Sequence, residues 1–510
     1  MAPATVPVTS PALARRWAIY TALIAVSLGQ AAGKILAVDS VDLTRLERYR
    51  IEAAMRREAD RLEEAGVEDT ERDARMAARR ERLEEEMRLG RPFLSANDRS
   101  RWLAIRAIAE NGVFYIDPLL EEPTWDTIDM VKHAGPDGEP RLYSSKPPLL
   151  MVLIAGPYWV LMQLTGSTLG ESPYLIGRTL LLLLNVGSLA VMLTSVACLV
   201  ERFGRRDTDR VFAMTAICFA TQLSSFAAVL NNHLFAAAAT ALATELWLGV
   251  IDIPKPTLRR CFATGVVTAF AVTCELPALA LAAWITLSLL LHRPKSTLKG
   301  FLPGALLVAV ALFGTNYLAH DSLRPPYAHR SETDPADNWY DYEYTVGGKT
   351  RDSYWRDRQG IDVGEPSKAR YALHALVGHH GVFSLTPVWI VSVFGLVRMA
   401  FARRGATREF AWGVLLVSAA CLAFYLGLRP QDDRNYGGMT TGFRWLYWLA
   451  PLWAAALPAA IRRLKRTHIG MAFAVACLAW SAMSASYPTW NPWTHPWIYQ
   501  WMDYLGFELP

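Results

Sequence analysis

Apolar stretches alternate along the chain with polar loops. A helix of about twenty apolar residues crosses the hydrocarbon core of a bilayer, and about eleven stretches approach that length. They are residues 17–37, 175–200, 211–230, 234–251, 261–275, 276–292, 300–318, 386–402, 409–428, 443–461 and 469–487. The pattern predicts an all-α polytopic membrane protein with about eleven transmembrane helices.

Arginine and lysine are concentrated in every second loop. These basic loops contain Arg15 and Arg16, Arg202, Arg205, Arg206 and Arg210, Lys255, Arg259 and Arg260, Arg293, Lys295 and Lys299, Arg403, Arg404 and Arg408, and Arg462, Arg463, Lys465 and Arg466. Loops rich in basic residues stay in the cytoplasm. We therefore expect a protein of the plasma membrane with a cytoplasmic N-terminus, and with the remaining loops and the C-terminus outside. No small-residue cleavage site follows residues 17–37, which indicates an uncleaved first helix.

Residues 148–165 are the test of this topology. They are apolar, but the stretch is short and is interrupted by Gly156 and Pro157. If it crossed the bilayer, the Arg202–Arg210 cluster would lie outside, against the charge rule. We predict a helix that lies along the outer interface or re-enters the bilayer.

Two long loops are predicted to face outward, at residues 38–147 and 319–385. Within the first, residues 42–89 carry many opposite charges three or four positions apart, which indicates a solvated helix or a helical hairpin broken near Gly66. A spacer or partner-binding arm suits this segment better than a catalytic role. The second loop is rich in aromatic residues and is expected to be a folded outer cap. The predicted regions are 1–37, 38–174, 175–318, 319–385, 386–487 and 488–510.

The composition supports a membrane protein and excludes other classes. Of the 510 residues, 52% are hydrophobic and only 19% are charged, which is too apolar for an ordinary soluble chain. The net charge of +5 arises mostly in the inner loops, so we expect no nucleic-acid partner. The six cysteines lie within or at the ends of apolar stretches and are expected to be core thiols. His379 and His380 lack metal-ligand spacing, so no metal is predicted, although an assisting divalent ion is left open.

The strongest local signal runs from Asp98 to Leu150. Asp98 opens an amphipathic helix that ends near Gly112, and Lys146 precedes two prolines and the apolar stretch 148–165. Asp98 has a simple structural interpretation as an N-cap. Lys146 also has a simple structural interpretation: the two prolines form a turn that starts the next helix, and the lysine side chain contacts lipid headgroups.

These residues, in this order, resemble the first outer loop of membrane glycosyltransferases of the GT-C fold. The most similar groups are the lipid A aminoarabinose transferases and the protein O-mannosyltransferase-like proteins, whose pattern is Asp-Glu-x-Arg-Tyr followed by Glu-Lys-Pro-Pro-Leu. Asp98, Arg101 and Trp102 match the first motif, and the run 146–149 matches the second. The stretches 175–188 and 442–453 resemble later spans of the family and carry Arg178 and Arg444 near their outer ends.

The sequence also departs from the family pattern. Arg99 and Ser145 replace the second acid and the Glu before Lys-Pro-Pro, and Glu275 stands where many relatives have Lys in the fifth span. These changes leave the donor sugar and the acceptor open.

The resemblance implies transfer of a sugar from a polyprenyl-phosphate donor to a lipid, glycan or protein acceptor outside the membrane. No other cofactor is implied. Asp98 is the candidate general base. Cations near the outer interface are candidates for the carrier phosphate; they are Lys146, Arg178, Arg429, Arg434 and Arg444. Further candidates for donor binding are Arg101, Asn231, His233, Glu275, Asp432 and Asp433.

Several alternatives remain open from the sequence. Asn231 is equally consistent with a helix cap, and residues 429–438 with a salt-bridged turn. The protein is alternatively a flippase or transporter of lipid-linked sugars, a transferase of a non-sugar phosphate group, or a non-catalytic scaffold. A transporter would need polar or broken helices at the bilayer midplane, whereas the polar residues here collect at one face.

Overall fold

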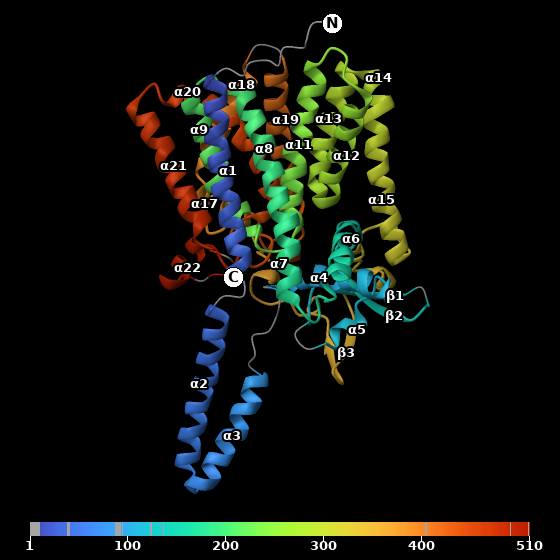
Figure 1. Cartoon of the computed structure of the whole chain (residues 1–510), viewed down its shortest axis with the longest axis vertical. Helices are drawn as coiled ribbons and strands as arrows, with labels where there is room; N and C mark the ends of the chain where they lie inside the picture. Colours follow the sequence, from blue (N-terminus) through green and yellow to red (C-terminus); the bar gives the residue numbers. More distant parts are fainter. Residues whose placement is uncertain are drawn as a thin grey trace.

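Long helices run side by side and form a bundle, and shorter elements collect at one end of it (Figure 1). This computed structural model describes residues 11–37, 41–86, 93, 95–122, 125–135, 137–402, 405–489, 491–507 and 509. The bundle contains α1 (Pro11–Ala37), α7 (Pro173–Leu181), α8 (Gly187–Phe203), α9 (Asp207–Phe219), α11 (Asn232–Asp252), α12 (Leu258–Cys274), α13 (Leu279–His292), α15 (Leu302–His320), α18 (Val388–Ala400), α19 (Ala406–Ala423), α20 (Ala450–Leu464) and α21 (His468–Ser486).

Short helical segments extend or connect these helices. They are η1 (Leu182–Val186), η2 (Leu276–Ala278), α14 (Pro294–Ser296), η3 (Thr297–Phe301), η7 (Phe424–Leu428) and η9 (Arg444–Leu449).

Seven helices of the described chain are long and apolar enough to cross a membrane, by length and composition. One of them is α6 (Pro148–Thr165), and the other six coincide with predicted spans. The remaining predicted spans contain helices too, but these are shorter or less apolar, such as α9 and α18. The structure thus confirms a helical membrane protein, while the number of eleven crossings stays a prediction.

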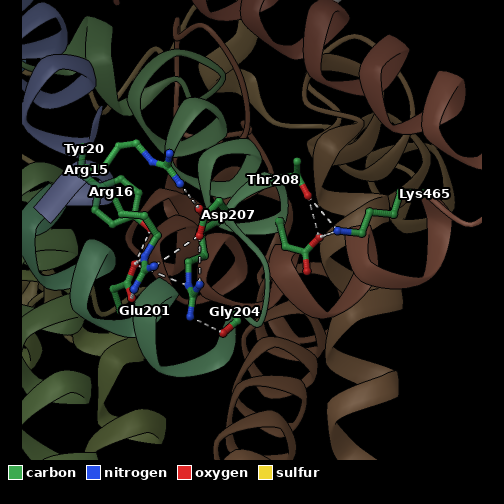
Figure 2. A network of polar contacts seen from close by, with 10 residues as sticks. Arg15, Arg16, Tyr20, Glu201, Gly204, Asp207, Thr208 and Lys465 are labelled. Atoms are coloured by element: carbon green, nitrogen blue, oxygen red, sulfur yellow. Dashed lines mark hydrogen bonds and ion pairs between the residues drawn. The ribbon is translucent and has the colours of Figure 1, made fainter. Parts of the chain in front are cut away.

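The basic loops meet at one end of the bundle, as Figure 2 shows for three of them. Arg16 donates through Nε and Nη2 to the two carboxylate oxygens of Glu201, at 2.9 and 3.0 Å. Lys465 donates to Thr208 Oγ1 at 2.8 Å and also contacts Asp209. Elsewhere at this end Arg202 pairs with Asp252, and Arg293 donates to the carbonyl oxygens of Ile251 and Ile253. All these loops therefore share one side, as the charge rule requires.

The helix α6 makes no net crossing between α1 and α7. Because α1 begins and α8 ends at the basic end of the bundle, the end of α1 and the start of α7 both lie at the opposite end. Figure 1 shows α6 foreshortened beside the lower part of α15, whereas α21, of similar length, runs lengthwise in the view. Its axis is thus inclined to the bundle, and its position at the interface or within the bilayer stays a prediction.

This topology predicts that residues 167 and 205 lie on opposite sides of the membrane. In single-cysteine variants Ser167→Cys and Arg205→Cys, a membrane-impermeant thiol reagent should label residue 167 from outside and residue 205 only after the membrane is opened. Of the native cysteines, five are buried and Cys198 is partly buried, so the unsubstituted protein is a low-background control. Labelling of both positions from the same side would contradict the topology.

The charged arm forms a helical hairpin, as predicted. Its helices are α2 (Val41–Glu64) and α3 (Asp69–Glu86), and the turn between them contains Gly66 at φ 65°. Ile51, Met55 and Leu83 form its small apolar core. The last predicted residues of the arm, 87–89, lie outside the described residues. The hairpin extends away from the bundle in Figure 1.

The two loops that are predicted to face outward pack against each other at the end opposite the basic loops. The first contains α4 (Ala96–Asn111), α5 (Asp117–Leu120), β1 (Met130–Ala134) and β2 (Pro140–Ser144). The second contains η4 (Pro326–Ala328), η5 (Pro335–Asp337), β3 (Glu343–Val346), β4 (Lys349–Asp352), η6 (Gly360–Val363), α16 (Lys368–Leu376) and α17 (Val382–Leu385). Further elements at this end are α10 (Leu223–Phe226), η8 (Gln431–Asp433) and α22 (Trp497–Tyr504).

Hydrogen bonds and apolar contacts join these loops. Lys132 N donates to Trp339 O at 3.0 Å, and Tyr342 Oη donates to Met130 O at 3.1 Å. Val131, Tyr143, Trp339 and Tyr340 form a shared apolar cluster. The second loop is therefore a folded cap, as its aromatic content predicts. The two antiparallel hairpins, β1–β2 and β3–β4, correct the expectation of an all-α fold, because the outer loops also contain strands.

Candidate functional site

Asp98 lies in the first turn of α4 and is not its N-cap. The cap is Ser95, whose Oγ accepts the Asp98 N–H at 3.1 Å, so the capping interpretation of Asp98 is wrong. The Asp98 carboxylate is instead buried, at 1% exposure, and its Oδ1 accepts hydrogen bonds from Trp102 Nε1 and Leu230 N, each at 3.0 Å. Burial raises the pKa of Asp98 to about 7, although both hydrogen bonds and two nearby arginines oppose the rise.

A partly buried ion pair lies beside this carboxylate: Asp129 is buried, and the side chain of Lys146 is 21% exposed. In the β1–β2 hairpin Met130 pairs with Ser144, and this register brings Asp129 next to the Ser145–Lys146 segment. Lys146 Nζ is 2.6 Å from Asp129 Oδ2. Asn97 Nδ2 donates to the same oxygen at 2.8 Å, and Ser145 Oγ donates to the other.

The ion pair is ionised at neutral pH. Burial opposes ionisation of Asp129, but the charge of Lys146 and the hydrogen bonds from Lys146 and Ser145 outweigh it and lower the pKa of Asp129 to about 2. Burial also lowers the pKa of Lys146 to about 8, against the attraction of Asp129. Because Lys146 forms an ion pair with Asp129, its side chain is held in place and is not free to contact lipid headgroups.

The polar contacts continue from this pair into the bundle. Arg101 donates through Nη1 to Asn97 Oδ1 at 2.5 Å and through Nη2 to Asn232 Oδ1 at 2.7 Å. Asn232 Nδ2 donates to Glu275 Oε1 at 2.8 Å, and the same oxygen contacts His233 Nδ1. One continuous network therefore links Lys146 to His233 and joins the first outer loop to α11 and the end of α12. Burial lowers the pKa of Arg101 to about 10.

Arg444 completes the charged cluster. It begins η9, and its guanidinium lies 5.0 Å from the ring of Trp493. The carboxylates of Asp129 and Glu275 are close enough to interact electrostatically with Arg444. Its Nε is buried and has no hydrogen-bond partner among the described residues. Three cations, Arg101, Lys146 and Arg444, thus share this end of the bundle with the carboxylates of Asp98, Asp129 and Glu275.

Asn231 has a capping role. Its Oδ1 accepts from His233 N at 2.8 Å and Leu234 N at 3.4 Å, so it caps α11. Its Nδ2 donates to the carbonyl oxygens of Phe226 and Val229. The neighbouring Asn232, rather than Asn231, belongs to the polar network, so the contacts of Asn231 agree with the helix-cap interpretation and its role in donor binding stays a prediction.

The predicted residues between 429 and 434 form a salt-bridged turn. Arg429 lies 3.4 Å from Asp433, and Arg434 donates to the carbonyl oxygens of Glu365 and Pro366 at 2.8 and 2.5 Å. Asp433 and Asp432 also pair with Arg330 and Arg358 of the cap, at 3.4 and 3.7 Å. These contacts join the folded cap to the turn. They favour a salt-bridged turn over donor binding for the four predicted residues, Arg429, Asp432, Asp433 and Arg434.

Arg178 lies on α7, where its guanidinium is 5.3 Å from the ring of Tyr174. Its helix packs on α1 and α6. Its predicted contact with a carrier phosphate stays a prediction.

Three residues of the network were missed by the sequence-based choice: Asn97, Asp129 and Asn232. Asn97 is four positions before Arg101 on α4, a spacing at which helical side chains meet, so this pair was detectable. Asp129 ends the run Trp-Asp-Thr-Ile-Asp, but its pairing with Lys146 depends on the strand register, which the run itself does not reveal.

No group of three or more His, Cys, Asp or Glu side chains in the described part of the chain is arranged to hold a metal ion. His379 and His380 are buried and pack with His374, His495 and Tyr436 in an aromatic cluster. The two histidines therefore have a packing role in the described structure.

These features define a polytopic helical membrane protein with a buried cluster of charged residues at one end of its bundle. No protein-family model matches the sequence, and no curated protein matches it. Among solved structures the chain is similar to an archaeal oligosaccharyltransferase, AglB from Archaeoglobus fulgidus, solved with an inhibitory peptide and a dolichol-phosphate. The two are 14% identical with a TM-score of 0.44, over 81% of this chain and 54% of the other. The chain thus spans about half the length of that protein.

Proposed function

We propose that the protein is a membrane glycosyltransferase that moves a sugar from a polyprenyl-phosphate carrier to an acceptor outside the membrane. The observation that carries this proposal is the continuous polar network from Lys146 to His233, with Asp98 beside it. It lies at the end of the bundle opposite the basic loops and is built from the two motifs that resemble the GT-C family. A lipid, a glycan or a protein is the acceptor, and nucleic acid has no part in the reaction.

The cations of the cluster suit the phosphate of the carrier. Lys146 and Arg101 are held in place by Asp129, Asn97 and Asn232. Fixed donors in a buried site stabilise charge that develops during a reaction, because they need no reorganisation. As the bond between the sugar and the phosphate breaks, these cations and Arg444 stabilise the departing phosphate.

Asp98 suits the role of general base. A base is most effective when its pKa lies near the working pH, and burial raises the pKa of Asp98 to about 7. In the proposed step a hydroxyl oxygen of the acceptor bonds to the anomeric carbon, the bond from that carbon to the phosphate oxygen breaks, and Asp98 takes the hydroxyl proton. The products are the glycosylated acceptor and the prenyl phosphate.

A transporter is less well supported. Transporters bind substrate near the bilayer midplane, between broken helices. Here the charged cluster is formed by the outer loops and by the helix ends at Asn232 and Glu275.

The carrier itself is the first test of the proposal. Lipids extracted from the purified protein should contain a polyprenyl-phosphate sugar, identified by mass spectrometry. Lys146→Ala should then weaken binding of farnesyl phosphate by about ten- to a hundredfold, because a charge-assisted hydrogen bond to a desolvated phosphate is lost. The matched control is Arg75→Ala on the charged hairpin, where Arg75 forms an exposed pair with Glu71. Equal affinities in the wild type and Lys146→Ala, with both proteins folded, would contradict a phosphate site at Lys146.

A further inference from the structure

His233 has one ring nitrogen in the polar network and one without a partner. Its side chain is buried, with the residue at 3% exposure. Nδ1 contacts Glu275 Oε1, whereas Nε2 has no hydrogen-bond partner among the described residues. Buried polar atoms in folded proteins nearly always have a partner, so each exception requires an explanation.

The contact with Glu275 determines what Nε2 can bind. A carboxylate only accepts hydrogen bonds, so Nδ1 carries the proton of the neutral ring. Nε2 is then left with a lone pair and is a hydrogen-bond acceptor. Asn232 donates to the same carboxylate oxygen and so holds Glu275 in place. The missing partner of Nε2 is therefore a donor such as a hydroxyl group.

Aromatic rings surround this histidine. Phe226 meets it edge to face at 5.4 Å between ring centres, and Tyr447 lies at 6.5 Å. Trp493 packs on Phe226 at 5.5 Å. Tyr447 is also one wall of a small cavity that α17, α18, η9 and α20 line.

The network relates His233 to the proposed phosphate site. From Lys146 it passes through Asp129, Asn97, Arg101, Asn232 and Glu275 to His233. In a polyprenyl-phosphate sugar the sugar is bonded directly to the phosphate. A carrier whose phosphate lies at Lys146 and Arg101 would therefore present its sugar hydroxyls to the groups that follow in the network.

We infer that His233 Nε2 binds a hydroxyl group of the transferred sugar, and that Glu275 is the positioning residue that keeps Nε2 an acceptor. This inference rests on the proposed function and adds a residue that recognises the sugar rather than the carrier. A site that hydrogen-bonds a hydroxyl discriminates against ligands that lack it. His233 would thus contribute to the choice of sugar.

Two variants separate recognition from structure. His233→Asn places an amide where Nδ1 lies, so that it can still donate to Glu275, but it removes the atom at the Nε2 position. Glu275→Met keeps roughly the length of the side chain but presents no carboxylate oxygen to Nδ1, so the ring proton is no longer held there and Nε2 is no longer kept an acceptor; Asn232 Nδ2 still donates to Cys274 O. Both variants should remain folded, as judged by thermal unfolding, and both should lose the proposed hydroxyl contact.

The probes are farnesyl phosphate and the same lipid carrying one sugar, a hexose or a pentose, whichever the wild type binds more tightly. Each variant should bind the glycosylated probe about three- to tenfold more weakly than the wild type, the effect of one lost neutral hydrogen bond. Neither variant should bind bare farnesyl phosphate more weakly than the wild type, because neither removes a cation of the proposed phosphate site. Lys146→Ala should weaken the binding of both probes, because both carry the phosphate that Lys146 is proposed to bind.

The outcomes distinguish the inference from the proposed function. If Lys146→Ala weakens both probes while the two variants bind the glycosylated probe like the wild type, the inference about His233 is overturned and the phosphate site stands. If Lys146→Ala changes neither affinity, the proposed function itself fails. If one variant does not fold, the other decides. If neither folds, monodeoxy forms of the glycosylated probe replace them: at least one should bind wild type three- to tenfold more weakly, and equal binding of all forms would overturn the inference.

Discussion

Asp98→Asn should leave the protein folded and reduce turnover by roughly 10²–10⁴-fold, the usual contribution of a general base. Asparagine keeps an oxygen that accepts from Trp102 Nε1 and Leu230 N, so the link between α4 and the segment before α11 survives. It removes only the ability to take a proton. Transfer of the sugar from the extracted donor, followed in a single turnover, measures the effect on the chemical step.

The thermal stability of Asp98→Asn is the control that shows whether the protein remains folded. The pKa of Asp98 is raised from the usual 3.8 to about 7, so this group favours folding below its unfolded pKa, and that contribution is lost as the pH rises through about 7. Asparagine carries no charge to bury and should leave thermal stability at pH 8 unchanged or higher.

Ser95→Ala supplies the opposite control. Loss of the true N-cap should cost about 1 kcal/mol of stability without a comparable loss of turnover. Full transfer activity in a folded Asp98→Asn protein would remove Asp98 from the mechanism.

Asp129→Asn should destabilise the protein by about 3–5 kcal/mol, as is typical when one partner of a buried ion pair is removed. Lys146 would then remain partly buried beside Asn97 and Ser145 without its counter-charge. The pKa of Asp129 is lowered to about 2, so its contribution to stability is present above the unfolded pKa and is lost as the pH falls towards 2. Unfolding in denaturant at pH 7, compared with the wild type, measures the loss.

A double variant separates the stability of this pair from its proposed role. Replacing a buried ion pair with apolar residues of similar volume is often neutral or stabilising. Asp129→Leu combined with Lys146→Met should therefore recover most of the stability lost in Asp129→Asn, yet bind farnesyl phosphate no better than Lys146→Ala. Wild-type stability of Asp129→Asn would contradict the buried pair, and wild-type phosphate affinity of the double variant would contradict its role.

Much of the fold was predictable because its signals are local. The helical segments, the hairpin turn at Gly66 and the clustering of basic loops follow from hydrophobic periodicity, turn-forming residues and charge. The interfacial or re-entrant position predicted for residues 148–165 rests on the same charge pattern, and α6 is inclined to the bundle. The strands of the outer loops were not predicted, since both hairpins are short and depend on contacts between distant loops.

The sequence by itself determined the residue types of the site and the end of the bundle at which they collect. Asp98, Arg101, Lys146 and Glu275 were named from motif order and from the cost of charge near the membrane. Only the tertiary structure decided their partners. Asp129 meets Asn97 across 32 positions, and Arg101 meets Asn232 across 131. Such pairs form because a strand register and the tertiary position of α4, whose Arg101 reaches the start of α11, bring them together, and neither is encoded in a local pattern.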